Sequence, residues 1–412
     1  MLMSSEFLFY TILFIIVFQF LLDTAVDYLN SRKFQDPVPE ELQDVYDNKE
    51  YLKSQAYKKD NYKFGILSSS FSIVLTLGFL IFGGFDWADK IAREQTDNPI
   101  LMALIFFGII IIGSDIITTP FSYYQTFVIE EKYGFNKSTR KLFFMDKLKG
   151  WLMMVILGGG ILSMIIWFFE VAGSNFWIYA LGLIAVFTVF MNLFYSRLIV
   201  PLFNKQTPLE DGPLKSKIEN YAREVGFKLQ NIFVIDGSRR STKANAYFAG
   251  FGKEKRVTLY DTLIQELEEE EIVAVLAHEI GHYKRHHIII NIVISILLTG
   301  VTLFILSLFI NNPEFSYAIG VTEPSFHAAL ICFGILYTPI SEITGVVMNM
   351  LSRKFEFEAD DYAKDTYAAL PLINSLKKLS KNSLSNLTPH SAYVFLHYSH
   401  PPLIQRIHNL KA

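Results

Sequence analysis

Three residues, His278, Glu279 and His282, have the types and the spacing of a metal site with a general base beside it. They lie in the stretch Val-Ala-Val-Leu-Ala-His-Glu-Ile-Gly-His, residues 273–282. Its apolar residues recur at helical spacing, which predicts an α-helix on which positions four apart share one face. Two imidazoles can then bind one ion, and Glu279 can reach a water on that ion. Zinc takes imidazole nitrogens at about 2.0–2.1 Å, and a catalytic zinc site keeps a fourth position for water.

The alternative interpretation of this stretch is a solvated helix face that carries two histidines by chance. Two features of the sequence favour the metal site instead. The motif lies in an apolar helix, where unpaired imidazoles and a carboxylate would be costly. A matching carboxylate ligand also follows downstream.

That third ligand is expected in the stretch Ser-Arg-Lys-Phe-Glu-Phe-Glu-Ala-Asp, residues 352–360. Two histidines at a catalytic zinc ion are commonly joined by one carboxylate. Glu356 and Asp360 are four apart, so Glu356 could bind the ion while Asp360 accepts the outer N–H of a ligand histidine. Glu358 points elsewhere on the helix and is the weaker candidate, although spacing alone leaves both glutamates open.

The composition of the chain indicates an integral membrane protein. Of its 412 residues 51% are apolar and 15% are aromatic, and the mean hydropathy of +0.30 is too high for an ordinary soluble enzyme of this size. The net charge of −3 gives no indication of a nucleic-acid partner. Cys332 is the only cysteine, which excludes a disulfide within the chain and a cysteine-based zinc site.

Seven apolar segments are long enough, or nearly so, to cross a hydrocarbon core of about 30 Å, which needs roughly 20 helical residues. No cleavable signal is expected, because the N-terminus runs directly into the first of these segments. Each segment could instead be a buried soluble helix, but seven together favour membrane spans. The predicted spans are residues 7–22, 64–85, 100–117, 151–171, 176–202, 288–310 and 326–351.

The distribution of lysine and arginine predicts the orientation of these spans. The connections after spans one, three and five and the tail after span seven carry seven, six, thirteen and eight of these residues, whereas the other three connections carry two, none and none. Such alternation distinguishes cytoplasmic from external loops. The N-terminus is therefore expected outside or in a lumen, and the C-terminus in the cytoplasm. Both metal motifs then lie on the cytoplasmic side, joined by the hairpin of spans six and seven.

The chain is accordingly divided into four parts. Residues 1–203 hold the first five spans, and residues 204–287 form the first part of a catalytic domain. Residues 288–351 hold spans six and seven, and residues 352–412 complete the catalytic domain with the third ligand. Ionisable residues inside the spans either form structural pairs or face a water-filled cavity; these are Asp115, Arg197 and Glu342.

The cytoplasmic part contains three predicted strands. Residues 231–236 resemble a short buried strand, and residues 245–248 and 256–260 resemble two strands joined through Gly250–Gly252. Proteases often bind substrate as an added strand at a sheet edge. Asn245, Ala246 and Tyr247 are candidates for such an edge, although a plain hairpin would have the same pattern.

The C-terminal tail offers two further candidates for the site. His400 could donate a hydrogen bond to the oxyanion of a tetrahedral intermediate, and Arg406 could hold a substrate carboxylate. Residue type alone favours surface positions for both. His286 and His287 are expected to be solvated or at the membrane interface.

Taken together, these motifs resemble the CAAX prenyl protease 1 family of integral-membrane zinc endopeptidases, over most of the chain. The resemblance includes Thr-Phe-Val-Ile-Glu-Glu-Lys-Tyr-Gly-Phe-Asn (126–136), Asn-Lys (204–205) and Ser-Thr-Lys-Ala-Asn-Ala-Tyr-Phe (241–248). It continues through the two metal motifs and His-Pro-Pro (400–402). Several separate motifs in the right order are far more specific than His-Glu-x-x-His alone.

The resemblance implies a mainly α fold, a seven-transmembrane helical barrel enclosing a chamber, with a cytoplasmic α/β zincin-like metalloprotease domain. It implies one zinc ion per chain on His278, His282 and Glu356, with Glu279 as catalytic base. Family members vary where Glu358 stands, which supports Glu356. It further implies that Asp360 supports a ligand and that the remaining candidates act in catalysis or substrate binding, namely His400, Arg406, Asn245, Ala246 and Tyr247.

Substrates of that family are C-terminal Cys-aliphatic-aliphatic-X peptides or proteins with a prenyl group on the cysteine. The expected function is therefore removal of the C-terminal tripeptide, with peptide or protein substrate and membrane lipid as partners. One alternative is a membrane-protein quality-control protease of the HtpX type, which is shorter and has fewer spans. Another is a seven-span transporter or receptor with a fortuitous motif.

Overall fold

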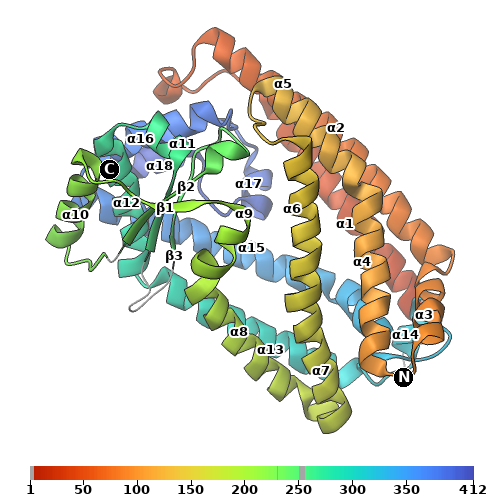
Figure 1. The fold of residues 1–412 in the computed structure, drawn as a ribbon. Coiled ribbons are helices and arrows are strands. Elements are labelled where there is room, and N and C mark those ends of the chain that lie inside the picture. Colours follow the sequence, from red (N-terminus) through yellow and green to blue (C-terminus); the bar gives the residue numbers. More distant parts are fainter. Residues whose placement is uncertain (1–3, 230, 250–255) are drawn as a thin grey trace.

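The computed structural model describes residues 4–229, 231–249 and 256–412. Long helices occupy most of the chain, and one small sheet lies at one end of the molecule (Figure 1). The helices diverge from a corner where α3, α7 and α14 lie, toward the end that carries the sheet. The longest helices are α1 (Ser5–Ser31), α2 (Asn48–Ile81), α4 (Pro99–Tyr124), α8 (Phe176–Leu198), α13 (His287–Phe309) and α15 (Phe326–Thr366).

Local sequence signals determine where several of these helices begin. Asp47 and Glu50 form a capping box at the start of α2, in which each side chain accepts a hydrogen bond from the other's backbone. Asn98 caps α4, and Pro99 occupies the first turn, where its missing N–H costs nothing. Ser325 caps α15 by accepting a hydrogen bond from the backbone N–H of Ala328.

Within the described residues, six helical segments are long and apolar enough to cross a membrane. The fourth of them, Arg140–Phe203, has 64 residues and contains both the fourth and the fifth predicted span. It is not one straight helix. Helix α7 (Gly159–Ala172) ends at Gly173, whose positive φ of 54° favours glycine. Helix α8 then begins at Phe176 and packs back against α7.

One apolar core holds the corner from which the helices diverge. It includes Ile12, Phe106, Phe176 and Ala329, with further residues of α3 (Gly84–Gln95) and α14 (Glu314–Ala318). Beyond this core the helices leave many large apolar side chains exposed, such as Val186 of α8. The long helices are therefore packed tightly at one end and only partly along their lengths.

The sequence predicts three ionisable residues inside spans. Of these three, only Asp115 of α4 forms a pair with another described residue. Its carboxylate accepts hydrogen bonds from Lys147 Nζ at 2.8 Å and from Trp151 Nε1 at 2.8 Å. Asp115 therefore forms a polar pair between α4 and α6 (Arg140–Met153). Arg197 and Glu342 are exposed, and no hydrogen bond or ion pair joins either to another described side chain.

The sheet has four strands in the order β1-β2-β4-β3. Strands β2 and β4 are parallel, and the other two pairs are antiparallel. The three predicted strands are present, and β3 lies at an edge; the predicted connection Gly250–Gly252 lies outside the described residues. The strands are β1 (Gln206–Pro208), β2 (Asn231–Ile235), β3 (Ala246–Ala249) and β4 (Arg256–Tyr260).

A second apolar core joins the sheet to the surrounding helices and to the connections between spans. It contains Leu42 and Phe135 from those connections, together with Leu259 of β4 and Ile280 of α12. The helices of this region are α10 (Pro213–Glu224), α11 (Asp261–Glu266), α12 (Glu269–Lys284), α16 (Ala369–Asn382), α17 (Ser391–His397) and α18 (Leu403–Lys411).

Shorter elements complete the chain, namely η1 (Arg32–Gln35), η2 (Glu40–Leu42), the π-helical η3 (Gln125–Glu130), α5 (Glu131–Tyr133), α6 (Arg140–Met153), the π-helical η4 (Met154–Gly158), η5 (Gly173–Asn175), α9 (Val200–Phe203) and η6 (Gly237–Arg239).

Candidate metal centre

Helices α12 and α15 pack closely enough to bring the two metal motifs together. Gly281 permits this approach, because a Cβ atom there would lie 3.1 Å from the backbone Cα and O of Ala359. Such contacts are tighter than packed side chains normally make. The glycine between the two histidines of the motif therefore sets the distance between α12 and α15.

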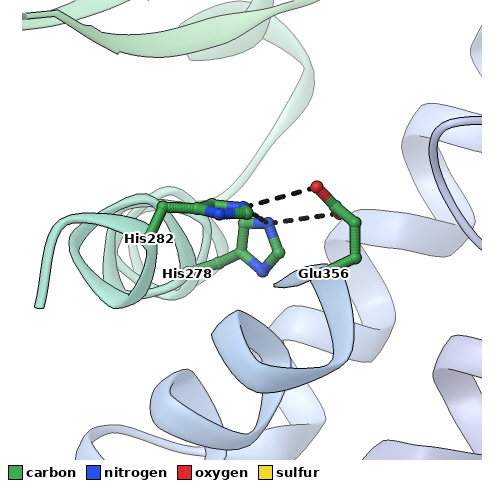
Figure 2. Close-up of side chains that lie close together, drawn as sticks. All are labelled: His278, His282 and Glu356. Atoms are coloured by element: carbon green, nitrogen blue, oxygen red, sulfur yellow. Dashed lines mark hydrogen bonds and ion pairs between the residues drawn. The ribbon is translucent and has the colours of Figure 1, made fainter. Parts of the chain in front are cut away.

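His278, His282 and Glu356 converge between these helices (Figure 2). The two imidazoles come from α12, and the carboxylate reaches them from α15. His278 Nε2 lies 3.2 Å from His282 Nε2. The Glu356 carboxylate places Oε2 3.5 Å from His278 Nε2, and Oε1 3.3 Å from His282 Nε2. Glu356, and not Glu358, is thus the carboxylate beside both imidazoles.

These donor atoms have the spacing of ligands on one ion. Two nitrogens bound tetrahedrally to zinc at about 2.0–2.1 Å lie about 3.3 Å apart, which matches the observed separations. Glu356 Oε2 is also buried without a hydrogen-bond partner, and its nearest cationic group, Arg406 Nη1, lies 3.4 Å away. A buried carboxylate oxygen that accepts no hydrogen bond remains available to a metal cation. The three residues fit a divalent metal ion on both geometry and chemistry.

Asp360 and Arg406 form a buried network behind His278. Asp360 is fully buried, and its Oδ1 lies 2.9 Å from His278 Nδ1. Arg406 donates to both carboxylate oxygens of Asp360, through Nε at 2.8 Å and Nη2 at 2.5 Å. Burial alone would lower the pKa of His278, but hydrogen bonds to Asp360 and Glu356 outweigh it and raise the pKa to about 9. Arg406 is thus engaged by two protein carboxylates, since its Nη1 also lies 3.4 Å from Glu356 Oε2.

His282 has a different partner, His287, which was expected to be solvated or at the membrane interface. His287 is only 2% exposed, so the first of the two expected environments, solvent, is wrong. Its Nδ1 lies 2.9 Å from His282 Nδ1, and its Nε2 lies 2.9 Å from Glu358 Oε2. Its ring stacks on Phe355, with 4.0 Å between centroids. His286 is exposed, as expected.

The signal that could have revealed His287 is its place at the start of an apolar run, where an unpaired imidazole would be costly. The five-residue spacing between His282 and His287, however, does not predict their contact. His286 has a left-handed backbone, with φ at 60°, and this turn separates α12 from α13. A five-residue spacing across such a turn does not follow helical geometry.

Glu279 directly follows His278 in α12, and His400 comes from the tail after α17. Among the described residues, no hydrogen bond or ion pair engages the Glu279 carboxylate, so it can accept a proton from a water. His400 Nε2 lies 3.3 Å from Glu356 Oε1, although 65% of the His400 side chain is exposed. The tail after α17 thus brings a histidine to the centre from far along the chain.

The predicted substrate-binding residues lie on and beside the edge strand β3. Ala246 and Tyr247 belong to β3, and Asn245 precedes it, with its side-chain Oδ1 accepting from the backbone N–H of Ala246 at 2.9 Å. Helix α12 packs against β3. The edge strand is therefore adjacent to the helix that carries the two metal-motif histidines.

Comparison with known proteins agrees with this arrangement. A family model described as CAAX prenyl protease N-terminal, five membrane helices, matches residues 27–205, and the model of peptidase family M48 matches residues 208–412. A CAAX prenyl protease 1 homolog of Oryza sativa subsp. japonica is 36% identical over 97% of this chain and 96% of the relative. The Homo sapiens homolog is 32% identical over 91% and 88%.

This chain belongs to the CAAX prenyl protease 1 family. The crystal structure of Ste24p from S. mikatae is similar throughout, with a TM-score of 0.92 and 33% identity over 98% of both chains. Membership of this family makes the chain an integral-membrane metalloprotease that acts on a peptide or protein substrate. It also removes the alternative of a transporter or receptor with a fortuitous motif.

Proposed function

We propose that this protein is a zinc endopeptidase that removes the C-terminal tripeptide from prenylated Cys-aliphatic-aliphatic-X proteins or peptides. The observation that carries the proposal is the convergence of His278, His282 and Glu356 at the separations of zinc ligands, beside an unengaged Glu279. The names of the relatives, CAAX prenyl protease 1, supply the substrate class.

The residues of the site have separate tasks in this reaction. His278, His282 and Glu356 would hold a zinc ion, which when bound would polarise the scissile carbonyl and acidify a water. Glu279 takes the proton of that water and delivers it to the leaving amine. His400 donates a hydrogen bond to the oxyanion that develops on the carbonyl.

Two further groups position the reactants. Asn245, Ala246 and Tyr247 hold the substrate backbone as an added strand at the free edge of β3. Asp360 fixes the ring of His278, and Arg406 fixes Asp360, so that Arg406 acts through the metal site and not on the substrate.

We infer seven membrane-spanning helices around a chamber, with the sheet-bearing domain in the cytoplasm. The break at Gly173 supports two spans within Arg140–Phe203. Glu342 supports a chamber, because it is exposed inside a span without an ion pair, and an ionisable group there is costly unless it meets water. The catalytic domain then comprises residues 204–287 and 352–412, and the lysine and arginine distribution gives its side of the membrane.

The test of this function is a cleavage assay with a farnesylated CAAX peptide beside its unprenylated twin. The proposal predicts release of the tripeptide from the farnesylated peptide, dependent on zinc and absent from Glu279→Gln. Cleavage of neither peptide, together with degradation of a misfolded membrane protein, would favour a quality-control protease instead.

A further inference from the structure

A groove of about 650 Å³ lies between α2 and α4, away from the residues of the metal centre. Its walls are apolar, and its rim carries Asp60, Lys63, Tyr124 and Lys132. The groove is thus apolar along its walls and charged at its rim. The wall residues are Phe64, Leu67, Pro120, Phe121, Val128 and Ile129.

Helix α4 is distorted where it lines this groove. Pro120 interrupts the helical hydrogen-bond ladder, and the π-helical segment Gln125–Glu130 follows directly. π-Helical turns of this kind frequently mark functional sites. On the opposite wall, the Phe64 ring of α2 stacks on Tyr124 with 4.9 Å between centroids. These rings and the distorted helix leave an apolar space that no described side chain fills.

The rim of the groove has an excess of positive charge. Lys132 Nζ lies 2.6 Å from Asp60 Oδ2, which also accepts from Tyr133 at 2.7 Å. Lys63 is exposed, and no hydrogen bond or ion pair joins it to another described residue. One lysine charge at the rim is therefore not neutralised.

Two acidic residues that follow along the chain, Glu130 and Glu131, do not line the groove, and the charge of Glu130 is neutralised by Lys243. Glu130 binds Lys243 at 2.9 Å and accepts from Tyr57 at 2.5 Å. Glu131 accepts from Asn136 at 2.7 Å.

The groove lies at the level expected for lipid headgroups. Lys63 directly precedes the apolar run of α2, and Pro120 follows the apolar run of α4. Both connections here are rich in lysine and arginine, which indicates the cytoplasmic face, where anionic lipids concentrate. Tyr124 has the amphipathic ring that is common at this level of a membrane.

We propose that this groove binds one anionic glycerophospholipid of the bilayer. Its phosphate lies by Lys63 and Lys132, and one acyl chain follows Phe64, Leu67 and Phe121. The lysine charges favour an anionic headgroup, and the apolar walls favour an attached acyl chain over a free phosphate. The site is independent of the peptidase reaction.

Native mass spectrometry of the full-length protein, released from nanodiscs of phosphatidylglycerol or phosphatidylcholine, tests the proposal. One phosphatidylglycerol should be retained in excess of phosphatidylcholine. Lys63→Ala should weaken its apparent affinity about fivefold, because one lysine near an anionic surface contributes about that factor. Lys59→Ala is the matched control, since Lys59 is an exposed lysine of the same helix that does not line the groove.

Two further measurements define the ligand. Leu67→Trp should fill the groove and displace the lipid while every rim lysine remains, and glycerol phosphate should not compete. A melting temperature within a few degrees of the native protein shows that each variant folds. Equal retention of both lipids, equal effects of Lys59→Ala and Lys63→Ala, competition by glycerol phosphate, or displacement of the lipid by a farnesylated peptide would each overturn the proposal.

Discussion

The imidazole of His287 lies between the metal-motif residue His282 and the carboxylate of Glu358, at 2.9 Å from each. If His282 binds a metal through Nε2, its Nδ1 carries the proton and donates a hydrogen bond to His287 Nδ1. His287 must then carry its own proton on Nε2 and donate a hydrogen bond to Glu358. The two ligand imidazoles are therefore held differently, His278 by a buried carboxylate and His282 by a neutral imidazole.

His287→Ala should weaken metal binding by about 10- to 100-fold, the usual cost of losing the partner that orients a ligand histidine. Affinity can be measured by competition with a chelator, and the spectrum of bound Co²⁺ should change with the ligand geometry. The matched control is His286→Asn, because His286 is the exposed neighbour and asparagine tolerates its left-handed backbone. Unchanged affinity in His287→Ala would show that this contact does not support the site.

Substitutions at the two glutamates should separate their roles. Glu356→Ala should abolish stoichiometric metal binding, because it removes one of three ligands. Glu358→Gln should leave binding nearly unchanged, since the amide oxygen still accepts from His287, whereas Glu358→Ala should weaken it moderately. The measurement is metal content after dialysis. Loss of metal in Glu358→Ala with full occupancy in Glu356→Ala would reverse the assignment.

The sequence could reveal the residues of this centre that follow regular geometry. His278 and His282 share a helix face by spacing alone, and the hairpin of spans six and seven placed Glu356 beside them. His287 was missed because the turn at His286 breaks the helical spacing. Residue type alone could not place the largely exposed His400 beside Glu356, because its approach depends on how the tail packs. In the sheet, β1 was missed because three residues ending in a proline carry no periodic pattern.

Glu279→Gln should keep the metal and lose turnover. The amide is nearly isosteric with the carboxylate but cannot take a proton from water, so the rate should fall by at least about 10²- to 10⁴-fold. Peptide cleavage and metal content measured on the same preparation check both statements. Normal turnover by this variant would exclude Glu279 as the base.

Gly281→Val should separate α12 from α15 and weaken the metal centre. The Cβ atom alone would lie 3.1 Å from the Ala359 backbone, so the helices must move apart, at a cost of about 1–3 kcal/mol of folding stability. Both the melting temperature and the metal affinity should fall. Gly150→Val is the control, since no described atom beyond the adjacent backbone of its own helix lies within 4 Å of a Cβ atom there. Equal effects of the two substitutions would mean that helix propensity, and not the close approach, is responsible.

Metal binding should depend on pH through His278. The pKa of this residue is about 9 in the metal-free protein, above the ordinary value of about 6.5, so its imidazole is protonated at neutral pH. This protonation stabilises the metal-free fold, and the contribution is lost as the pH rises through 9. A metal requires the neutral imidazole and displaces the proton, so apparent affinity should rise about tenfold per pH unit from pH 7 and level off near pH 9. Asp360→Asn removes a carboxylate that raises this pKa, and the plateau should therefore begin at lower pH. An affinity that stays constant between pH 7 and 9 in the native protein would contradict the protonated state of His278.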